Sequence, residues 1–465
     1  MVFDFNAEFL AKYDTYGPRY TSYPTAAQFD ESFDRDAYIE HTRISNDALL
    51  PRPLSVYVHI PFCHSLCYFC ACHKIVTQQS NKADKYLEYV YKEISLQSQL
   101  FDSDRLVNLI HLGGGTPNFL STEQIEGLLE CIARNFHLGY PGELEISIEI
   151  DPRYTDAEQI LALRNLGFNR FSIGVQDFSP AVQKAINRLQ SEQQVLDIVA
   201  AAQKGGESSV SVDLISGLPH QTEESFENTL KILANAEVGR LAIYNFAYLP
   251  ERIASQKMLD PTTLPDVATR FAITRNALQY LQRSGYEHIG MDHFALPHDN
   301  LSKARRSGSL QRNFQGYTTH AETDLVGIGV SAISQFEHAF SQNSAHLPSY
   351  YAMLDTGHLP TSRGISLSQD DKIRRDIIQT IMCQQKVQFD VFEQQYQLDI
   401  RQYFSSVWER LQGFSEDGLL TLNEQGFYIT SKGRYFLRNI AMVFDGYFTA
   451  DNRSRENVVK FSKTI

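Results

Sequence analysis

Short apolar segments rich in β-branched residues alternate along the chain with longer amphipathic segments. The apolar segments are residues 55–62, 106–112, 144–150, 168–175, 209–217 and 241–247. Between them, stretches such as residues 83–100 and 122–136 repeat apolar residues at helical spacing. Ser121 or Thr122 can cap the second of these helices. Strands that alternate with helices in this way predict βαβ units and a parallel sheet.

Glycine and polar residues gather where these strands end. Gly113–Gly115 follow the second strand, and we place Glu149, Gln176 and Asp213 at the ends of the third, fourth and fifth strands. Barrel enzymes build their sites at the C-terminal ends of their strands. Six units with polar residues on one rim fit a barrel better than a short open sheet. We therefore predict an α/β fold with a partial (β/α)6 barrel of the TIM type.

The two ends of the chain follow other patterns. Residues 17–25, GPRYTSYPT, are rich in aromatic residues and proline and predict an extended arm packed on a surface. Near the other end, helical segments lead to two short strands around residues 423–426 and then to a helix, which resembles a winged-helix module. We divide the chain into an N-terminal arm (1–50), a barrel (51–355) and a mostly helical, winged-helix-like cover domain (356–465).

Composition narrows the class of protein. The 465 residues carry a formal net charge of −13, which disfavours a general nucleic-acid binder because such proteins neutralise phosphates. No apolar run reaches the length of a membrane span, and the first residues lack the pattern of a secretory signal. We expect a cytoplasmic protein that binds neither nucleic acid nor membrane.

Four of the six cysteines fall within ten residues, at Cys63, Cys67, Cys70 and Cys72. In a reducing compartment such a cluster indicates metal binding or redox chemistry. Zinc is one alternative, with His64 or His73 as further ligands, although structural zinc sites usually join two separated ligand pairs. The spacing C-x3-C-x2-C also differs from that of bacterial ferredoxins. A single loop of this kind can offer three thiolates to a cubane iron–sulfur cluster and leave one iron open.

Longer strings of residues carry a resemblance that covers essentially the whole chain. They are PRYTSYPT, YVHIPFCHSLCYFCACHKIVT, GGGTP, SIEIDPR, GVQDF, DLISGLP, GMDHFA and NFQGYTT. With these strings the chain resembles the oxygen-independent coproporphyrinogen III oxidase family of radical S-adenosylmethionine (SAM) enzymes. Phe69, directly before the third cysteine, fits the aromatic position of the radical SAM cysteine motif.

The resemblance implies a set of cofactor-binding residues. Cys63, Cys67 and Cys70 would hold one [4Fe–4S] cluster, with Cys72 a neighbour and not a ligand. Two SAM molecules would share the site. The first would contact Tyr57, Gly114, Glu149, Ala247 and Ile333, and the second Phe69, Gly115, Thr116, Gln176, Arg188 and Asp213. Tyr57, Glu149 and Ile333 would also take part in catalysis, together with Phe314 and Gln315.

The activity implied by the resemblance is an anaerobic oxidative decarboxylation. A 5′-deoxyadenosyl radical would remove a hydrogen from the β-carbon of a substrate propionate, and loss of CO₂ and one electron would leave a vinyl group. Two propionates of coproporphyrinogen III would react in turn, giving protoporphyrinogen IX in haem biosynthesis. The substrate has four carboxylates, so an acidic protein needs a locally basic pocket. Arg19 is our candidate for a propionate partner, the alternative being a surface arginine paired with an acid.

Two other functions remain open. A haem chaperone-like paralogue would keep the barrel and the cysteine loop, but such paralogues typically lack the PRYTSYPT arm and a cysteine at the position of Cys72. A DNA-binding redox regulator would read DNA with its winged region, yet residues 361–465 hold 14 Lys and Arg against 13 Asp and Glu, a net charge of only +1. The electron donor and acceptor are unknown, and we expect a monomer.

Overall fold

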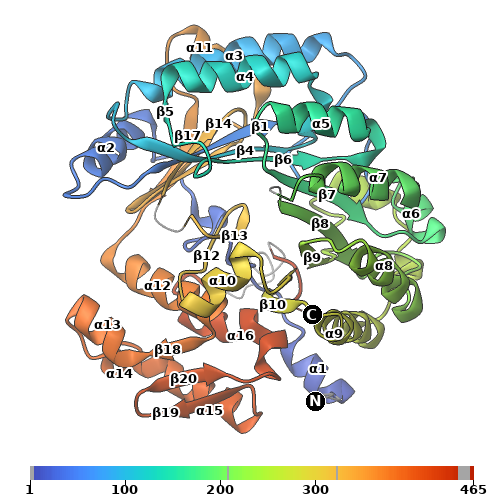
Figure 1. The fold of residues 1–465 in the computed structure, drawn as a ribbon. Helices are drawn as coiled ribbons and strands as arrows, with labels where there is room; N and C mark the ends of the chain where they lie inside the picture. The colour runs from blue at the N-terminus through green and yellow to red at the C-terminus, as the bar shows by residue number, and fades with distance from the viewer. Residues whose placement is uncertain (1–4, 207–208, 321–322, 449–460, 465) are drawn as a thin grey trace.

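The computed structural model describes residues 5–206, 209–320, 323–448 and 461–464. Its centre is a curved sheet in which six parallel strands lie side by side in the order of the chain (Figure 1). These strands are β1 (Leu54–Ile60), β4 (Leu106–Gly114), β6 (Glu145–Ile150), β7 (Arg170–Gln176), β8 (Ser209–Ser216) and β9 (Arg240–Asn245). Each coincides within about two residues with a predicted apolar segment, so the partial barrel is confirmed.

The sheet is wider than the predicted barrel. A further strand, β14, pairs in parallel with the free edge of β1, and antiparallel strands continue the sheet beyond it. At the opposite edge two short antiparallel strands follow β9. The added strands are β10 (Glu287–Gly290), β11 (His293–Ala295), β14 (Asp324–Ile328), β15 (Ile333–Phe336), β16 (Ala339–Asn343) and β17 (Thr361–Ser366), with β5 (His137–Leu138) beside β4.

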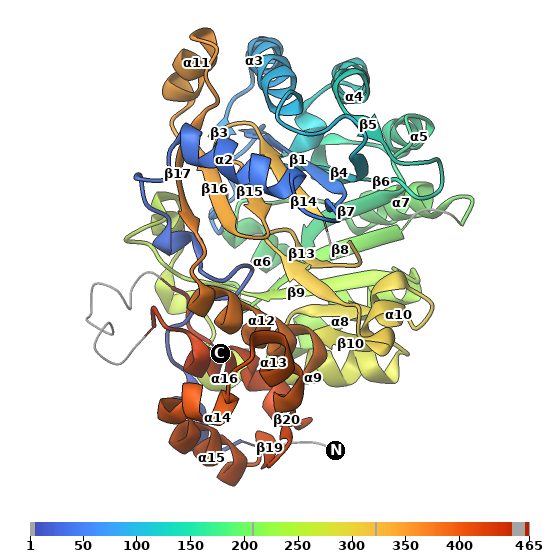
Figure 2. The same ribbon diagram turned by 90° about the vertical axis from the view of Figure 1, so that its left-hand side faces the viewer.

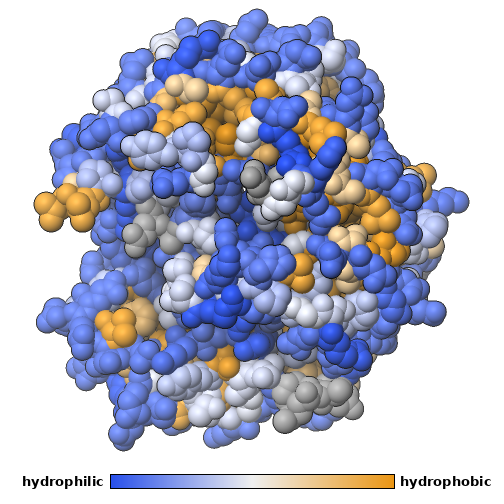
Figure 3. Space-filling view, viewed as in Figure 1, coloured by the Kyte–Doolittle hydropathy of each residue, from blue (hydrophilic) through white to orange (hydrophobic). Residues whose placement is uncertain are grey.

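Helices cover the convex face of the sheet (Figure 1). They are α3 (Asn81–Ser98), α4 (Thr122–Asn135), α5 (Ala157–Asn165), α6 (Pro180–Ala185), α7 (Glu192–Gln203), α8 (Glu223–Asn235), α9 (Val267–Arg283) and α11 (Leu347–Asp355). Ser121 caps α4 in a capping box with Gln124, one of the two predicted caps. Hydrophobic residues gather between α3, α4 and the strands, where Figure 3 shows the apolar layer from one end of the barrel.

The N-terminal arm differs in part from the prediction. Its middle is irregular, as expected, but helices α1 (Ala7–Tyr13) and α2 (Arg35–Asn46) flank it. Asn6 and Asp34 cap these helices with their side chains, which supplies start signals that the aromatic and proline-rich middle of the arm had obscured. The arm crosses from the cover domain to the barrel and contacts both (Figure 2).

The cover domain has its own apolar core, to which the arm contributes Leu10 and Tyr13. Its helices are α12 (Gln369–Gln384), α13 (Phe389–Tyr396), α14 (Ile400–Tyr403), α15 (Trp408–Glu416) and α16 (Leu437–Ala441). The two predicted strands are β19 (Leu420–Asn423) and β20 (Gly426–Ile429), and β18 (Lys386–Gln388) completes a three-stranded sheet. This helical, winged arrangement matches the prediction.

Three small pieces lie near the barrel opening. The cysteine loop runs between β2 (Phe62–Cys63) and β3 (Ile75–Val76), which pair in parallel. A hairpin of β12 (Gln311–Asn313) and β13 (Gly316–Thr318) follows α10 (Asn300–Ser307) on the concave side of the sheet (Figure 1).

Among the described residues, no helix combines the length and apolarity needed to cross a membrane.

Candidate active site

The four clustered cysteines line one cavity of about 300 Å³ at the C-terminal ends of the parallel strands. All four are free thiols. The loop that carries them is closed by backbone hydrogen bonds from Ile75 N to the Pro61 carbonyl (2.7 Å) and from Thr77 N to the Cys63 carbonyl (3.0 Å). The other two cysteines, Cys131 on α4 and Cys383 on α12, are buried away from this cavity.

The glycine loop after β4 passes against the end of β1. Gly114 has φ +119°, and a Cβ atom there would lie 2.7 Å from the His59 ring. A Cβ at Gly115 would lie 2.7 Å from the Pro61 carbonyl oxygen, so both positions require glycine. Thr116 then donates its hydroxyl to the sulfur of Cys63 at 3.3 Å. The glycines therefore bring the backbone to the cavity and to the first cysteine.

Glu149, at the end of β6, faces the cavity and is held at both carboxylate oxygens. One oxygen accepts the Gly114 N–H at 3.0 Å, and the other lies 3.4 Å from Nε2 of His111. Burial opposes ionisation, but the hydrogen bond and charge of His111 and the Gly114 N–H outweigh it and hold the pKa of Glu149 below its usual value. Tyr57 stacks on the His111 ring at 5.7 Å, so Tyr57 supports Glu149 through that ring.

The pKa of Asp213, two strands away on β8, is shifted in the opposite direction. Burial and the neighbouring charge of Glu149 raise its pKa to about 7, and the hydrogen bond from Ser172 (3.0 Å) only partly opposes them. Gln176, at the end of β7, takes φ +70°, which turns the chain at the cavity wall. Among the carboxylates of the cavity, the pKa of Glu149 is thus lowered, whereas Asp213 titrates near neutral pH.

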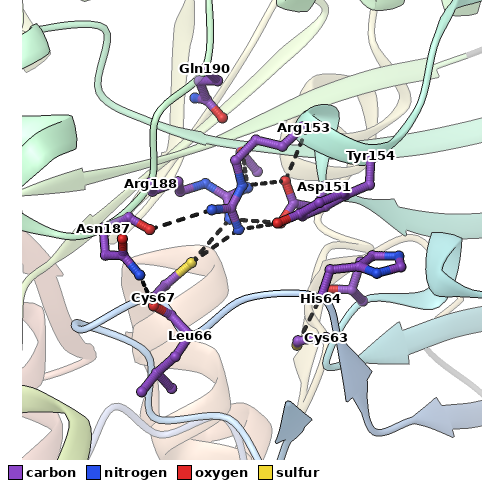
Figure 4. Close-up of polar contacts among 12 residues, drawn as sticks. Cys63, His64, Leu66, Cys67, Asp151, Arg153, Tyr154, Asn187, Arg188 and Gln190 are labelled. Atoms are coloured by element: carbon purple, nitrogen blue, oxygen red, sulfur yellow. Dashed lines mark hydrogen bonds and ion pairs between the residues drawn. The ribbon is translucent and has the colours of Figure 1, made fainter. Parts of the chain in front are cut away.

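Two arginines converge on Asp151 and on the sulfur of Cys67 (Figure 4). Arg188 Nη1 lies 3.0 Å from Asp151 and 3.4 Å from the sulfur, and its Nη2 donates to the Gly174 carbonyl at 2.5 Å. Arg153 Nη2 lies 2.7 Å from Asp151 and 3.3 Å from the same sulfur. Sequence reasoning assigned a role to Arg188 but missed Asp151 and Arg153, although both lie in the string SIEIDPR.

Eight of the predicted cofactor-binding residues line the cavity. They are Phe69, Gly114, Gly115, Thr116, Glu149, Gln176, Arg188 and Asp213. Three others, Tyr57, Ala247 and Ile333, are not among its lining residues. Ala247 still lies close to the cysteine loop, because Gln256 donates both to its carbonyl (2.9 Å) and to the Phe69 carbonyl (3.1 Å).

The residues predicted near the reacting centre separate into two environments. Phe314 and Ile333 pack against a small apolar cluster that contains Phe29 of the arm and Phe340. Gln315 lines a second polar cavity of about 90 Å³, which shares Glu149, Ser172, Asp213 and Tyr244 with the first. The side-chain nitrogen of Gln315 is buried and has no hydrogen-bond partner among the described residues. Gln315 therefore offers an unused donor next to the cysteine cavity.

Arg19 is paired within the protein. Its Nη2 lies 2.8 Å from Asp292, and its guanidinium group lies over the Tyr244 ring at 5.5 Å. This is the pairing that the alternative interpretation of Arg19 predicted, although the partner is buried. Its role toward a substrate stays a prediction.

Comparisons with known proteins decide the family. The model of the Radical SAM superfamily matches residues 57–233, and that of the HemN C-terminal domain matches residues 367–436. The oxygen-independent coproporphyrinogen III oxidase of Salmonella typhimurium is 44% identical over 463 residues, which is 99% of this chain and 99% of that protein. The chain belongs to the oxygen-independent coproporphyrinogen III oxidase family.

Other members of this family agree with the assignment. The Synechocystis protein of the same name is 43% identical over 466 residues and covers 99% of this chain and 98% of its own length. The solved structure of coproporphyrinogen III oxidase (HemN) from Escherichia coli, described as a radical SAM enzyme, superposes with a TM-score of 0.89 at 42% identity. It covers 96% of this chain and 100% of its own.

The site residues fit the cofactors that a radical SAM enzyme uses, a [4Fe–4S] cluster and SAM. Three free thiols of the C-x3-C-x2-C loop line one cavity with the glycine loop and with Glu149. Arg188 adds a buried Nε that has no hydrogen-bond partner in the described part of the chain, and its side chain lines the same cavity. An unused guanidinium donor suits a carboxylate such as that of the methionine moiety.

Proposed function

We propose that the protein carries out the anaerobic oxidative decarboxylation of two propionate side chains of coproporphyrinogen III to vinyl groups, giving protoporphyrinogen IX in haem biosynthesis. The observation that supports this proposal most directly is the cavity that gathers Cys63, Cys67 and Cys70 with Glu149 and Arg188 in a member of this family. The reaction class is a radical SAM oxidoreduction.

Cys63, Cys67 and Cys70 would hold the cluster, and two SAM molecules would share the cavity. When bound, the cluster and SAM supply the radical that removes a hydrogen from the substrate, which is chemistry that no amino-acid side chain here provides. The two groups of SAM contacts remain those predicted from the sequence. In support, all six residues of the second group line the cavity, as do Gly114 and Glu149 of the first.

The chain's own residues would bind and orient the ligands and exclude water from the cavity. Glu149, ionised and fixed by the Gly114 N–H, is suited to an ammonium or hydroxyl group of a ligand. Arg188 can offer its free Nε to a carboxylate, and Asp213 can accept or donate a hydrogen bond near neutral pH. Phe314 and Ile333 would close the reacting centre with apolar surface, while Gln315 and Arg19 would contact polar groups of the substrate.

The remaining partners are part of the same proposal. The substrate is a small tetrapyrrole, one electron donor reduces the cluster, and a separate acceptor takes the final electron. We propose a monomer in the cytoplasm, where free clustered thiols are compatible with the reducing environment. The arm, barrel and cover domain would keep the predicted boundaries at residues 50 and 355.

The test is an anaerobic assay with defined components. The reconstituted protein is incubated with coproporphyrinogen III, SAM and a chemical reductant, and the products are separated after oxidation to porphyrins. We expect SAM-dependent formation of the divinyl product, with the monovinyl intermediate appearing first. A protein that gives no vinyl product but binds haem tightly would instead be the chaperone-like paralogue, and the proposal would be wrong.

A further inference from the structure

Arg153 has every nitrogen of its guanidinium group engaged by the protein. Nε donates to Asp151 at 3.0 Å, Nη1 to the Asn187 carbonyl at 3.4 Å, and Nη2 to Asp151 and to the sulfur of Cys67. Its side chain is only 10% exposed. Four of the five N–H donors of Arg153 therefore contact the protein, and these contacts are those of a residue that holds other residues in place.

Arg188 differs in the one respect that matters for ligand binding. It reaches the same sulfur and the same carboxylate, but its buried Nε has no partner in the described residues. If Arg188 turned to a ligand in the cavity, Asp151 and Cys67 would still be held by Arg153. The two arginines beside one cysteine are thus not equivalent: each guanidinium nitrogen of Arg153 has a partner in the protein, whereas the Nε of Arg188 has none among the described residues.

The segment that carries Arg153 is itself rigidly anchored. Asn118 donates to the Asp151 carbonyl at 3.0 Å and accepts the Asp151 N–H at 2.9 Å, so this backbone is fixed against the neighbouring unit. Tyr154, the next residue, lies 4.4 Å from the ring of His64 on the cysteine loop, and Figure 4 shows the two rings beside each other. Asn187 also donates to the Leu66 carbonyl at 2.8 Å. The position of Cys67 is therefore set by contacts that meet at Arg153.

We propose that Arg153 is a positioning residue for the iron–sulfur cluster, which fixes Cys67 by its N–H···S hydrogen bond and raises the reduction potential of the cluster. The proposal rests on the proposed function, because it assumes that Cys67 is a cluster ligand. Reduction adds one electron from an external donor and hence one negative charge, without making or breaking a covalent bond. A buried cation and an N–H donor at a ligand sulfur stabilise that added charge.

The experiment compares the reconstituted full-length protein with three variants, Arg153→Gln, Arg153→Lys and Arg134→Gln. Arg134 is an exposed arginine on α4 paired with Glu130, and it serves as the matched control. Iron content, the electron paramagnetic resonance spectrum of the reduced cluster and its midpoint potential are measured without SAM. Thermal unfolding of each apoprotein reports whether it folds.

At a fixed applied potential, we expect Arg153→Gln to lower the ratio of reduced to oxidised cluster about tenfold, which for one electron corresponds to a shift of about 59 mV to more negative potential. Arg153→Lys keeps the charge but not the planar pair of donors, so it should show a smaller shift in the same direction. Arg134→Gln should match the parent.

Every other outcome either supports or contradicts the proposal. Full iron content and an unchanged potential in both Arg153 variants would overturn it. If both variants unfold at the parent temperature but hold less iron than Arg134→Gln, the positioning of Cys67 is supported directly. If both unfold well below the parent, Arg153 is a general folding residue and the proposal is wrong. A parent protein without a [4Fe–4S] cluster would instead contradict the proposed function.

Discussion

Glu149 and Asp213 show how neighbouring carboxylates in one cavity acquire different proton affinities. Glu149 has a hydrogen bond from the backbone and an imidazole partner, whereas Asp213 has one serine hydroxyl and the unfavourable charge of Glu149. Because the pKa of Asp213 is raised to about 7, its folded form holds a proton that the unfolded chain releases near pH 4. Folding is therefore less favourable above pH 7 than below pH 4.

Replacing Asp213 with Asn should remove this pH dependence. In the parent, stability falls as pH rises from about 4 to about 7, because the folded state binds more protons than the unfolded state in that window. We expect the melting temperature of the Asp213→Asn apoprotein to exceed that of the parent more at pH 8 than at pH 5. Asp102→Asn, at an exposed position, is the control. An equal difference at both pH values would show that Asp213 does not hold its proton.

The cysteines should separate by function when each is replaced with Ala. Replacing Cys63, Cys67 or Cys70 removes one of three proposed ligands, so visible cluster absorption and SAM cleavage should both be lost. Cys72→Ala should keep most of its iron, since the resemblance makes Cys72 a neighbour. Iron content and the visible spectrum after anaerobic reconstitution measure how much cluster each variant keeps. Equal iron loss in the Cys72 variant would make it a ligand.

At the scale of single residues, the sequence was enough to find those whose neighbours in the chain already reveal their chemistry. The cysteine spacing and the three glycines are local patterns, and both lead directly to the cavity. Arg153 could not be found in this way, because its role depends on Cys67, which lies 86 residues earlier in the chain. For Arg19 the sequence supplied the candidate and the alternative of an acidic partner, but it could not identify Asp292, which lies 273 residues later.

At the scale of elements, a buried carboxylate ties helix α3 to the sheet. Glu93 is completely buried and accepts hydrogen bonds from Gly329 N (2.7 Å), the Tyr350 hydroxyl (2.6 Å) and the Asn343 amide (2.6 Å). These donors lie after β14, on α11 and on β16. One side chain thus fixes the turn that leads into β15, where Ile333 begins the strand.

Glu93→Ala should destabilise the protein by about 3 kcal/mol, because it leaves the Gly329 N–H and the Tyr350 hydroxyl without an acceptor and removes one acceptor of the Asn343 amide. Glu88→Ala on the exposed side of the same helix should change stability by less than about 0.5 kcal/mol. Urea unfolding of both variants, followed by circular dichroism, measures the difference. Equal midpoints for the two variants would mean that the Glu93 contacts contribute nothing net.

The elements that sequence analysis predicted well are those whose burial is continuous. The six parallel strands read as apolar runs because helices cover one side and the barrel interior the other. Strands β14 to β17 were missed because they are short and contain Gly and Ser, and because β14, which joins them to the sheet, pairs with β1 across 270 residues. Helices α1 and α2 were missed for a similar reason, since each packs on segments far along the chain.

At the scale of the whole molecule, Arg438 fastens the arm to the cover domain. Its guanidinium group, 6% exposed as a residue, donates to the carbonyls of Pro18 (3.0 Å), Gly17, Lys463 (2.7 Å) and Ser462 (3.1 Å). A Cβ at Gly17 would clash with the sulfur of Met442, so the arm also packs closely on this domain. Arg438 thus adds a buried cation to the contacts that hold the middle of the arm, such as the hydrogen bond from Tyr20 to Asp445.

Arg438→Met should free the arm while keeping most of the side-chain volume. A hydrogen bond to a charged group is worth about 1.5 kcal/mol or more, so a net loss equal to one such bond would already raise the open population about tenfold. We expect limited proteolysis to cut within residues 14–34 about ten times faster than in the parent, as read by mass spectrometry. The control variant Arg283→Met, at the exposed end of α9, should be cut at the same rate as the parent. Unchanged cleavage in the Arg438 variant would show that other contacts hold the arm.

The tie between Arg438 and Gly17 joins residues 421 positions apart, and Thr464 N–H similarly bonds the Thr15 carbonyl. During translation the arm leaves the ribosome first, whereas the groups that receive it are made hundreds of residues later. The barrel strands and the cysteine loop are therefore complete while residues 15–18 of the arm are still undocked. Docking of residues 15–18 therefore waits until their partners at Arg438 and Thr464 have emerged.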